Sequence, residues 1–304
     1  MVNGWAINSN AMIKKFLFAV KMFFILGKKS QTFLDAKWVR LLLKSTPQKY
    51  KKTVALNILA LSPHYFFGEG KDRKSFLLRE YRRNLRSRQL LFKYIISHHI
   101  SPQYVVMDYG CGPGFLAKIV ATKTKKVYAL DISDGVLLCA KTINYKDNLH
   151  YLNVFKDEAN RIDDNSVDLI YSFAVLQHVS ENLITGIFDL FYAKLKLNGK
   201  VLLQVQLIAD GWKTEMEWKK DQTITGKLKY KYGLHAFSNS VSFYSDKLER
   251  SKLKFLSMVE LKDVLPFPFD DIYNQQLISA QKLPIDASGN FVNEEMSSVN
   301  HQNP

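Results

Sequence analysis

The sequence predicts an α/β protein with an open, doubly wound, mostly parallel sheet. Three observations lead to this fold class. Beyond residue 101, short apolar runs rich in Val, Ile, Leu, Phe and Tyr alternate with stretches long enough for crossover helices. A glycine-rich turn follows the first of these runs, as expected where a strand leads into a helix. The first hundred residues instead show helical periodicity, so we expect a helical extension before the sheet domain.

The N-terminal extension is expected to contain several helices. Residues 12–26 are strongly apolar, but lysines recur in and just after this segment at positions 14, 21 and 28. Either a helix lying in a membrane interface or an ordinary packed helix with a solvated edge explains this pattern. Residues 35–44, 50–61 and 74–97 follow as further helices, and proline-containing turns end the first two.

The helix at 74–97 carries one stripe of residues at steps of three and four, which places them on a single face. Its members are Leu78, Tyr81, Leu85, Arg88, Phe92 and Ile95. Arg88 either extends its guanidinium to water or faces a bound carboxylate or phosphate. Because an isolated charge on an apolar face is costly, we predict that the stripe packs on the sheet domain and turns Arg88 inward, where it would meet the carboxylate of a bound ligand.

Basic residues are concentrated in the first third of the chain. The chain has 43 Lys plus Arg and 28 Asp plus Glu, and residues 1–100 hold 20 of the former and 4 of the latter. Such a segment suits an anionic membrane surface; nucleic acid is a possible partner that we favour less. No run reaches the roughly 20 apolar residues of a spanning helix. We expect a cytoplasmic protein, peripheral at a membrane if this segment binds lipid.

Seven apolar stretches are the strand candidates. Five of them fit parallel strands, at residues 104–108, 126–131, 150–155, 167–173 and 199–207, and two more follow at 255–264 and 276–281. We expect residues 1–100 to form a basic helical cap, residues 101–283 the sheet domain, and residues 284–304 a disordered tail. Residues 208–242 form an insert that we expect to act as a substrate lid.

The glycine-rich turn after the first strand indicates a ligand at the carboxyl end of the sheet. Its spacing is Gly110-x-Gly112-x-Gly114, whereas a dinucleotide site needs G-x-G-x-x-G. Asp108 precedes the first glycine, and a carboxylate there would repel a phosphate but attract an amine or a sulfonium. The sequence therefore favours a cationic ligand.

Asp131 lies at the end of the second strand, where a carboxylate commonly holds a ribose diol. Together with the Asp108-x-Gly-x-Gly-x-Gly run, it makes residues 102–282 resemble the class I S-adenosylmethionine-dependent methyltransferases. The resemblance implies a Rossmann-like fold with a seven-stranded sheet and S-adenosyl-L-methionine as the cofactor. It does not imply a metal, and two cysteines also exclude a zinc module or a disulfide scaffold.

The resemblance also implies a set of cofactor-binding residues. The turn resembles the family's first motif, which wraps the methionine part of the cofactor and here comprises Asp108, Tyr109, Gly110, Cys111, Gly112 and Gly114. Asp131 resembles the ribose-binding acid and Ile132 the apolar neighbour that touches adenine. Asp157 and Glu158 resemble the segment whose acid meets the adenine amino group, although Lys156 stands where glycine is usual. Phe173 closes the segment that resembles the fourth-strand motif.

His178 is the catalytic candidate, because it follows Phe173 by five residues at the cofactor end of the sheet. Methyl transfer from a sulfonium is a direct displacement, so alignment alone can supply most of the acceleration. A hydroxyl acceptor could still use a positioned base. Phe173-Ala174-Val175-Leu176 stands where adenine-N6 methyltransferases have Asp or Asn followed by Pro-Pro-aromatic, which counts against that chemistry.

We therefore expect an S-adenosylmethionine-dependent methyltransferase that acts on a small or a lipid- or carrier-linked molecule by O-methylation. Two alternatives remain open at this point. One is an RNA methyltransferase that uses the basic N-terminal segment to hold its substrate. The other is a non-catalytic scaffold that binds the cofactor.

Overall fold

A computed structural model describes residues 37–60, 73–156, 158–231, 234–266, 275–286, 288 and 290–292. The predicted helix at residues 12–26 lies outside this part of the chain, and so does Asp157. Among the described residues, no helix combines the length and the apolar character that crossing a membrane requires.

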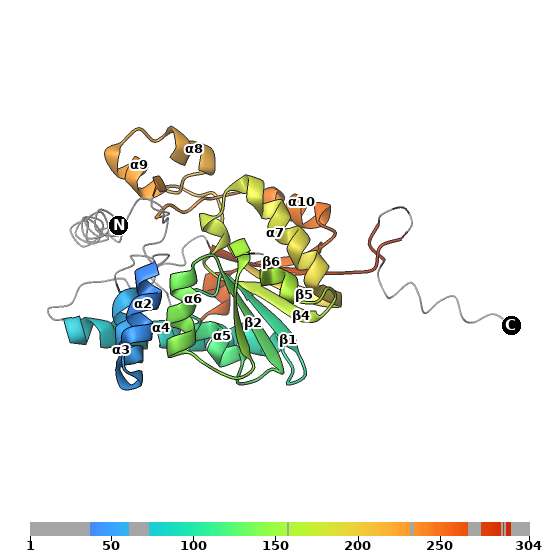
Figure 1. Ribbon diagram of the computed structural model, residues 1–304. Helices are drawn as coiled ribbons and strands as arrows, with labels where there is room; N and C mark the ends of the chain where they lie inside the picture. The colour runs from blue at the N-terminus through green and yellow to red at the C-terminus, as the bar shows by residue number, and fades with distance from the viewer. Residues whose placement is uncertain are drawn as a thin grey trace.

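A seven-stranded sheet forms the centre of the protein (Figure 1), with the strand order β3-β2-β1-β4-β5-β7-β6. The first five strands are parallel, and β7 runs antiparallel to both β5 and β6. The strands are β1 Val105–Tyr109, β2 Lys126–Asp131, β3 Leu149–Asn153, β4 Val167–Ser172, β5 Leu195–Gln206, β6 Lys254–Glu260 and β7 Gln275–Gln281. The strand order reverses direction at β1, which confirms the predicted doubly wound fold.

Helices cover both faces of the sheet because neighbouring residues of each buried strand point to opposite sides. In β1, Met107 and Tyr109 belong to a core shared with α7 (Glu181–Lys194) and α10 (Val241–Arg250). Val106, the neighbour of Met107 in the strand, belongs to a core shared with α5 (Phe115–Val120). The continuous apolar sequence of the central strands follows from this two-sided burial.

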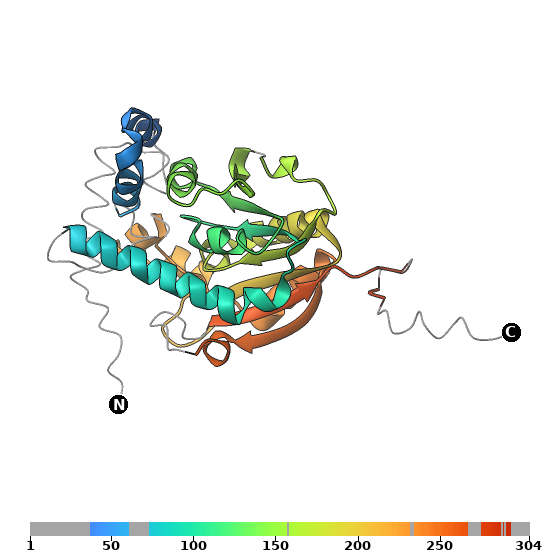
Figure 2. The ribbon, with the colours of Figure 1, turned by 90° about the horizontal axis from the view of Figure 1, so that it is seen from below.

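The N-terminal helices pack on the sheet domain at two places. Helices α2 (Lys37–Ser45) and α3 (Gln48–Leu59) lie against α6 (Asp134–Ile143), beside the sheet in Figure 1. Helix α4 (Arg73–Tyr94) packs on α5 and runs along one face of the sheet in Figure 2.

The buried face of α4 differs from the predicted stripe. Leu78 is 47% exposed, whereas Glu80, Asn84 and Leu91 are buried. Leu77 packs on the core in place of Leu78, and the buried face of α4 includes polar groups. Arg83 and Arg79 lie 3.0 Å and 3.8 Å from the carboxylate of Glu80. These cationic partners offset the cost of burying its negative charge.

One further prediction needs correction at the C-terminal end. The apolar stretch at 255–264 forms a strand only as far as Glu260, after which α11 (Leu261–Val264) begins. At the start of the predicted tail, Val292 N–H donates to Pro284 O at 2.9 Å and Ile285 bridges Phe291. Residues 293–304 lie outside the described part of the chain, so the disordered tail stays a prediction.

The insert after β5 contains two short helices, α8 (Glu215–Lys220) and α9 (Ile224–Lys231), which stand apart from the sheet in Figure 1. Helix α8 begins at a capping box, in which Thr214 and Glu217 bond each other's backbone N–H groups. Because β5 is parallel to β1 and β4, the insert leaves the sheet at the same edge as the glycine-rich turn.

Candidate functional site

The glycine-rich turn crosses from the end of β1 toward β2. The N–H groups of Gly110 and Cys111 both donate to Leu130 O, at 2.7 Å and 2.8 Å. Gly110 has a φ of +81°, and a Cβ at this position would overlap the side chain of Val175. The turn therefore needs glycine here for two reasons, a left-handed backbone and lack of space.

Asp131 ties the turn to the start of α6. Its Oδ2 accepts a hydrogen bond from Gly112 N at 2.9 Å, and its Oδ1 accepts one from Ser133 N at 3.0 Å. The side chain is buried at the carboxyl end of β2, next to the turn. The position agrees with that expected for a ribose-binding acid, and the structure adds a role in shaping the turn.

Asp108 is a buried carboxylate at the base of a pocket. Tyr171 OH donates to its Oδ2 at 3.0 Å. Burial raises the pKa of Asp108 to about 7; the Tyr171 hydrogen bond and the Arg88 guanidinium act in the opposite direction, and Asp131 adds to the rise. The carboxylate is therefore poised to gain from a cation placed in the pocket.

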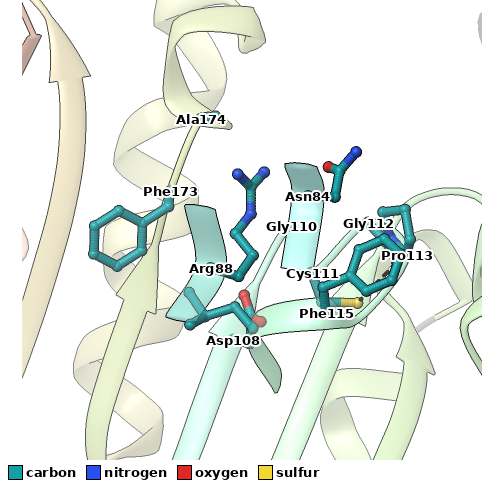
Figure 3. A pocket seen from close by; sticks show the side chains of 11 residues that line it. Asn84, Arg88, Asp108, Gly110, Cys111, Gly112, Pro113, Phe115, Phe173 and Ala174 are labelled. Carbon is teal, nitrogen blue, oxygen red and sulfur yellow. Dashed lines mark hydrogen bonds between the residues drawn. The ribbon is translucent and has the colours of Figure 1, made fainter. Parts of the chain in front are cut away.

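Arg88 enters the same pocket from α4 and is half-buried there. Figure 3 shows its guanidinium between Phe173 and Asn84, with Asp108 at the base. Nη1 donates to Ser87 Oγ at 3.1 Å. Burial lowers the pKa of Arg88, and the Asp108 carboxylate opposes that effect. The structure places Arg88 beside the glycine-rich turn and not in bulk water.

The pocket lies between α4 and the turn (Figure 3), and both main-chain and side-chain groups line it. Its lining comprises Asn84, Arg88, Asp108, Gly110, Cys111, Gly112, Pro113, Phe115, Leu116, Phe173 and Ala174. Burial raises the pKa of the Cys111 thiol well above its usual range, which keeps the sulfur protonated and poorly nucleophilic. Asn84 was not predicted, although it lies one helical turn before Arg88 on the same face.

Three predicted cofactor-binding residues have other surroundings. The side chain of Tyr109 lies in the core edge-on to Phe191, with ring centroids 5.1 Å apart, so only its backbone can reach the turn. Ile132 is 42% exposed beyond the end of β2. Glu158 accepts a hydrogen bond from Asn153 N at 2.7 Å and lies 3.6 Å from Arg161. The binding roles of these residues stay predictions.

His178 lies in the short helix η4 (Leu176–His178), outside the residues that line the pocket. Its side chain is exposed, and its Nδ1 lies 2.5 Å from His235 O in the insert. Phe237 N–H of the insert also donates to Gln177 O at 2.6 Å. Two backbone segments far apart in sequence therefore hold His178 at the junction of η4 and the insert.

An aromatic cluster lies on the insert side of this junction. His235 is buried against Tyr230, Phe237 and Trp218, with ring centroids 5.0, 4.4 and 6.1 Å away. Burial lowers the pKa of His235, which keeps its ring neutral. Within the described part of the chain, His235 Nδ1 and the nearby Gln177 Oε1 are buried without a hydrogen-bond partner.

Comparison with known proteins gives one family match. The family described as a methyltransferase domain matches residues 107–203. An uncharacterized protein of Haemophilus influenzae is 40% identical over 67 residues, a match that covers 22% of this chain and 25% of that protein. The chain thus matches only a quarter of the length of this curated relative.

Comparison with solved structures gives similarities at low sequence identity. An S-adenosylmethionine-dependent methyltransferase from Mesorhizobium loti is 16% identical, with 63% of this chain and 97% of that chain covered and a TM-score of 0.47. Magnesium protoporphyrin IX methyltransferase from Synechocystis is 15% identical, with 77% and 97% covered and a TM-score of 0.48.

The family match spans the strands that carry Asp108, the glycine-rich turn, Asp131 and Phe173. These are the positions on which the sequence resemblance was based. The family match covers about a third of the chain, within the sheet domain, and supports the resemblance of this domain to the S-adenosylmethionine-dependent methyltransferases.

Proposed function

We propose that the protein transfers a methyl group from S-adenosylmethionine to a hydroxyl of a small or a lipid- or carrier-linked acceptor. Binding of S-adenosylmethionine is supported by one observation, the pairing of opposite charges in one pocket. Asp108 offers a carboxylate, Arg88 offers a guanidinium, and both stand beside the glycine-rich turn. The methionine end of the cofactor carries an ammonium and a carboxylate, which match these two groups.

Different residues of the site would bind different parts of the cofactor. Arg88 would hold the cofactor carboxylate, and Asp108 would hold the ammonium, directly or through water. Asp131 would accept from the ribose hydroxyls with the lone pairs that its bonds to Gly112 and Ser133 leave. The sulfonium of the bound cofactor supplies an activated methyl group. The work of the protein is then to align the acceptor oxygen with it, a contribution on the order of 7 to 11 kcal/mol in favourable cases.

The junction of η4 and the insert is the acceptor side of this proposal. His178 Nδ1 faces the backbone carbonyl of His235, which can only accept a hydrogen bond. The proton of a neutral His178 ring would therefore lie on Nδ1, and Nε2 would be the nitrogen that accepts a proton. Such a nitrogen can take a proton from an acceptor hydroxyl.

The test is a search for the methylated product. The purified protein is incubated with methyl-labelled S-adenosylmethionine and separate small-molecule, lipid and RNA fractions of a cell extract. We expect label in the small-molecule or lipid fraction. A methyl ether keeps the label in alkali, whereas a methyl ester releases it. Label in RNA would instead support the RNA methyltransferase alternative. Calorimetric binding of the cofactor with no labelled fraction would support the scaffold.

A further inference from the structure

The hairpin of α2 and α3 has one face that the protein covers and one that it leaves exposed. The covered face contains Val39 and Leu43 of α2 and Ala55, Ile58 and Leu59 of α3. These side chains pack in one cluster with Val136, Cys139 and Ile143 of α6. The hairpin is therefore anchored to the sheet domain without using its other side.

The exposed face of the hairpin is both apolar and basic. Leu41 is 69% exposed, Leu42 40% and Tyr50 52%. Lys37 and Lys44 lie one helical turn on either side of Leu41 and are also exposed. We call the exposed side chains of residues 37, 41, 42, 44 and 50 the hairpin face.

Negative charge is absent from the sequence of this hairpin. Residues 37–60 contain six Lys plus Arg and not one Asp or Glu. The positive charge continues onto the sheet domain, because Lys118 lies close enough to Lys52 and Lys146 for their charges to add to the burial that lowers its pKa. An anionic partner would relieve this repulsion.

We infer that the hairpin face docks on an anionic lipid bilayer. Exposed leucines flanked by lysines can bury in the boundary between head groups and acyl chains while the ammonium groups meet lipid phosphates. A nucleic acid would satisfy the lysines but would leave Leu41 and Leu42 in water. Figure 2 shows the hairpin beside the sheet, at the edge of the molecule.

The hairpin that carries the docking surface contacts the helix that lines the cofactor pocket. Helix α3 contacts both α6 and α4, and α4 carries Arg88. A lipid-linked acceptor would thus be concentrated near the enzyme by the same contact. The inference does not depend on methyl transfer, because bilayer binding is measured without cofactor or acceptor.

The experiment is flotation of the full chain with vesicles of phosphatidylcholine alone and of phosphatidylcholine mixed with phosphatidylserine. We expect binding only to the mixed vesicles. L41Q/L42Q should weaken that binding about tenfold or more through lost apolar burial. K37Q/K44Q should weaken it about 30-fold at low salt through the loss of two cations near the surface.

Matched variants use exposed side chains on other elements. L183Q/L256Q removes two leucines that are 53% and 45% exposed, and K123Q/K125Q removes two exposed lysines. Both should float like the parent. Unchanged thermal unfolding of all four variants shows that the fold is intact.

Three results would overturn the inference. If L41Q/L42Q floats like the parent, the hairpin face does not enter the bilayer. The partner is a nucleic acid if K37Q/K44Q loses binding to RNA while L41Q/L42Q binds both RNA and vesicles as the parent does. If L41Q/L42Q alters the sedimentation coefficient or the unfolding temperature in the absence of lipid, the leucines are covered by another copy or by another segment of the chain.

Discussion

Arg88 and Asp108 come from elements of different origin, a helix of the N-terminal extension and the first strand of the sheet, yet line one pocket. Their charges act on each other: the guanidinium lowers the pKa of Asp108, and the carboxylate raises that of Arg88. Burial works against both charges and outweighs this attraction. A zwitterionic ligand between them would supply the missing opposite charges, so the pocket is incomplete without one.

Replacing Arg88 should weaken binding of the cofactor. Arg88→Leu removes a cation from the pocket, and each charge-assisted hydrogen bond to a carboxylate is worth about 1.5 to 3 kcal/mol. We therefore expect a rise in Kd of about 10- to 150-fold by calorimetry. Arg82→Leu, on the exposed side of the same helix, is the control and should bind like the parent. Equal affinities for all three proteins would contradict the assignment of Arg88.

Asp108 should make the stability of the protein depend on pH. Its folded pKa of about 7 lies above the ordinary value for a carboxyl group, so the folded state holds this proton more tightly than the unfolded state. The resulting stabilisation is complete below the ordinary carboxyl pKa and is lost as pH rises through about 7.

Urea unfolding between pH 4 and pH 9 measures this effect as a difference between the parent and Asp108→Asn. The free energy of unfolding of the parent should fall relative to that of the variant as pH rises. Tyr171→Phe removes a hydrogen bond that lowers the pKa of Asp108. In this variant, the fall in the free energy of unfolding with rising pH should therefore occur at higher pH than in the parent. A constant difference across the pH range would rule out titration of Asp108.

Gly110→Ala should destabilise the protein for two separable reasons. A Cβ would overlap Val175, and an alanine at a φ of +81° is strained by about 1 to 2 kcal/mol. Adding Val175→Gly to this variant should restore the stability lost through overlap and leave the loss due to backbone strain. Denaturant unfolding of both single variants and the double variant gives the coupling energy. A coupling energy of zero would show that the turn moves away from Val175.

Much of the fold could be predicted because its signals are local. Strands buried on both faces produce continuous apolar runs, and the Asp-Gly-rich turn marks the carboxyl end of the first one. Arg88 could be predicted to face inward because a charge in an apolar stripe needs a partner. The same stripe misled at Leu78, since helical periodicity does not reveal that Glu80, paired with the exposed Arg79 and Arg83, occupies the buried side. The contacts of His178 with His235 depend on how the insert folds back, which no local pattern encodes.

Asp131→Ala should weaken cofactor binding more than loss of the ribose contacts alone. The carboxylate also holds the N–H groups of Gly112 and Ser133, so its removal frees the turn as well. We expect a loss of affinity of more than about 10-fold, because at least one charge-assisted bond disappears. Asp131→Asn keeps an oxygen for one of these N–H groups and should bind with intermediate affinity. Calorimetry with S-adenosylmethionine and with adenosine distinguishes the ribose contribution from that of the methionine end.

His178→Gln should slow methyl transfer to a hydroxyl without changing cofactor affinity. The imidazole is held by His235 O at the junction with the insert, away from the residues that line the cofactor pocket. Loss of a general base costs roughly 10²- to 10⁴-fold in kcat. In the parent, the rate should fall at low pH, where a base is protonated, and this limb of the pH profile should disappear in the variant. His150→Gln replaces an exposed histidine on β3 and should leave both rate and profile unchanged. A His178→Gln enzyme as fast as the parent would mean that alignment of the acceptor, and not proton removal by His178, carries the reaction.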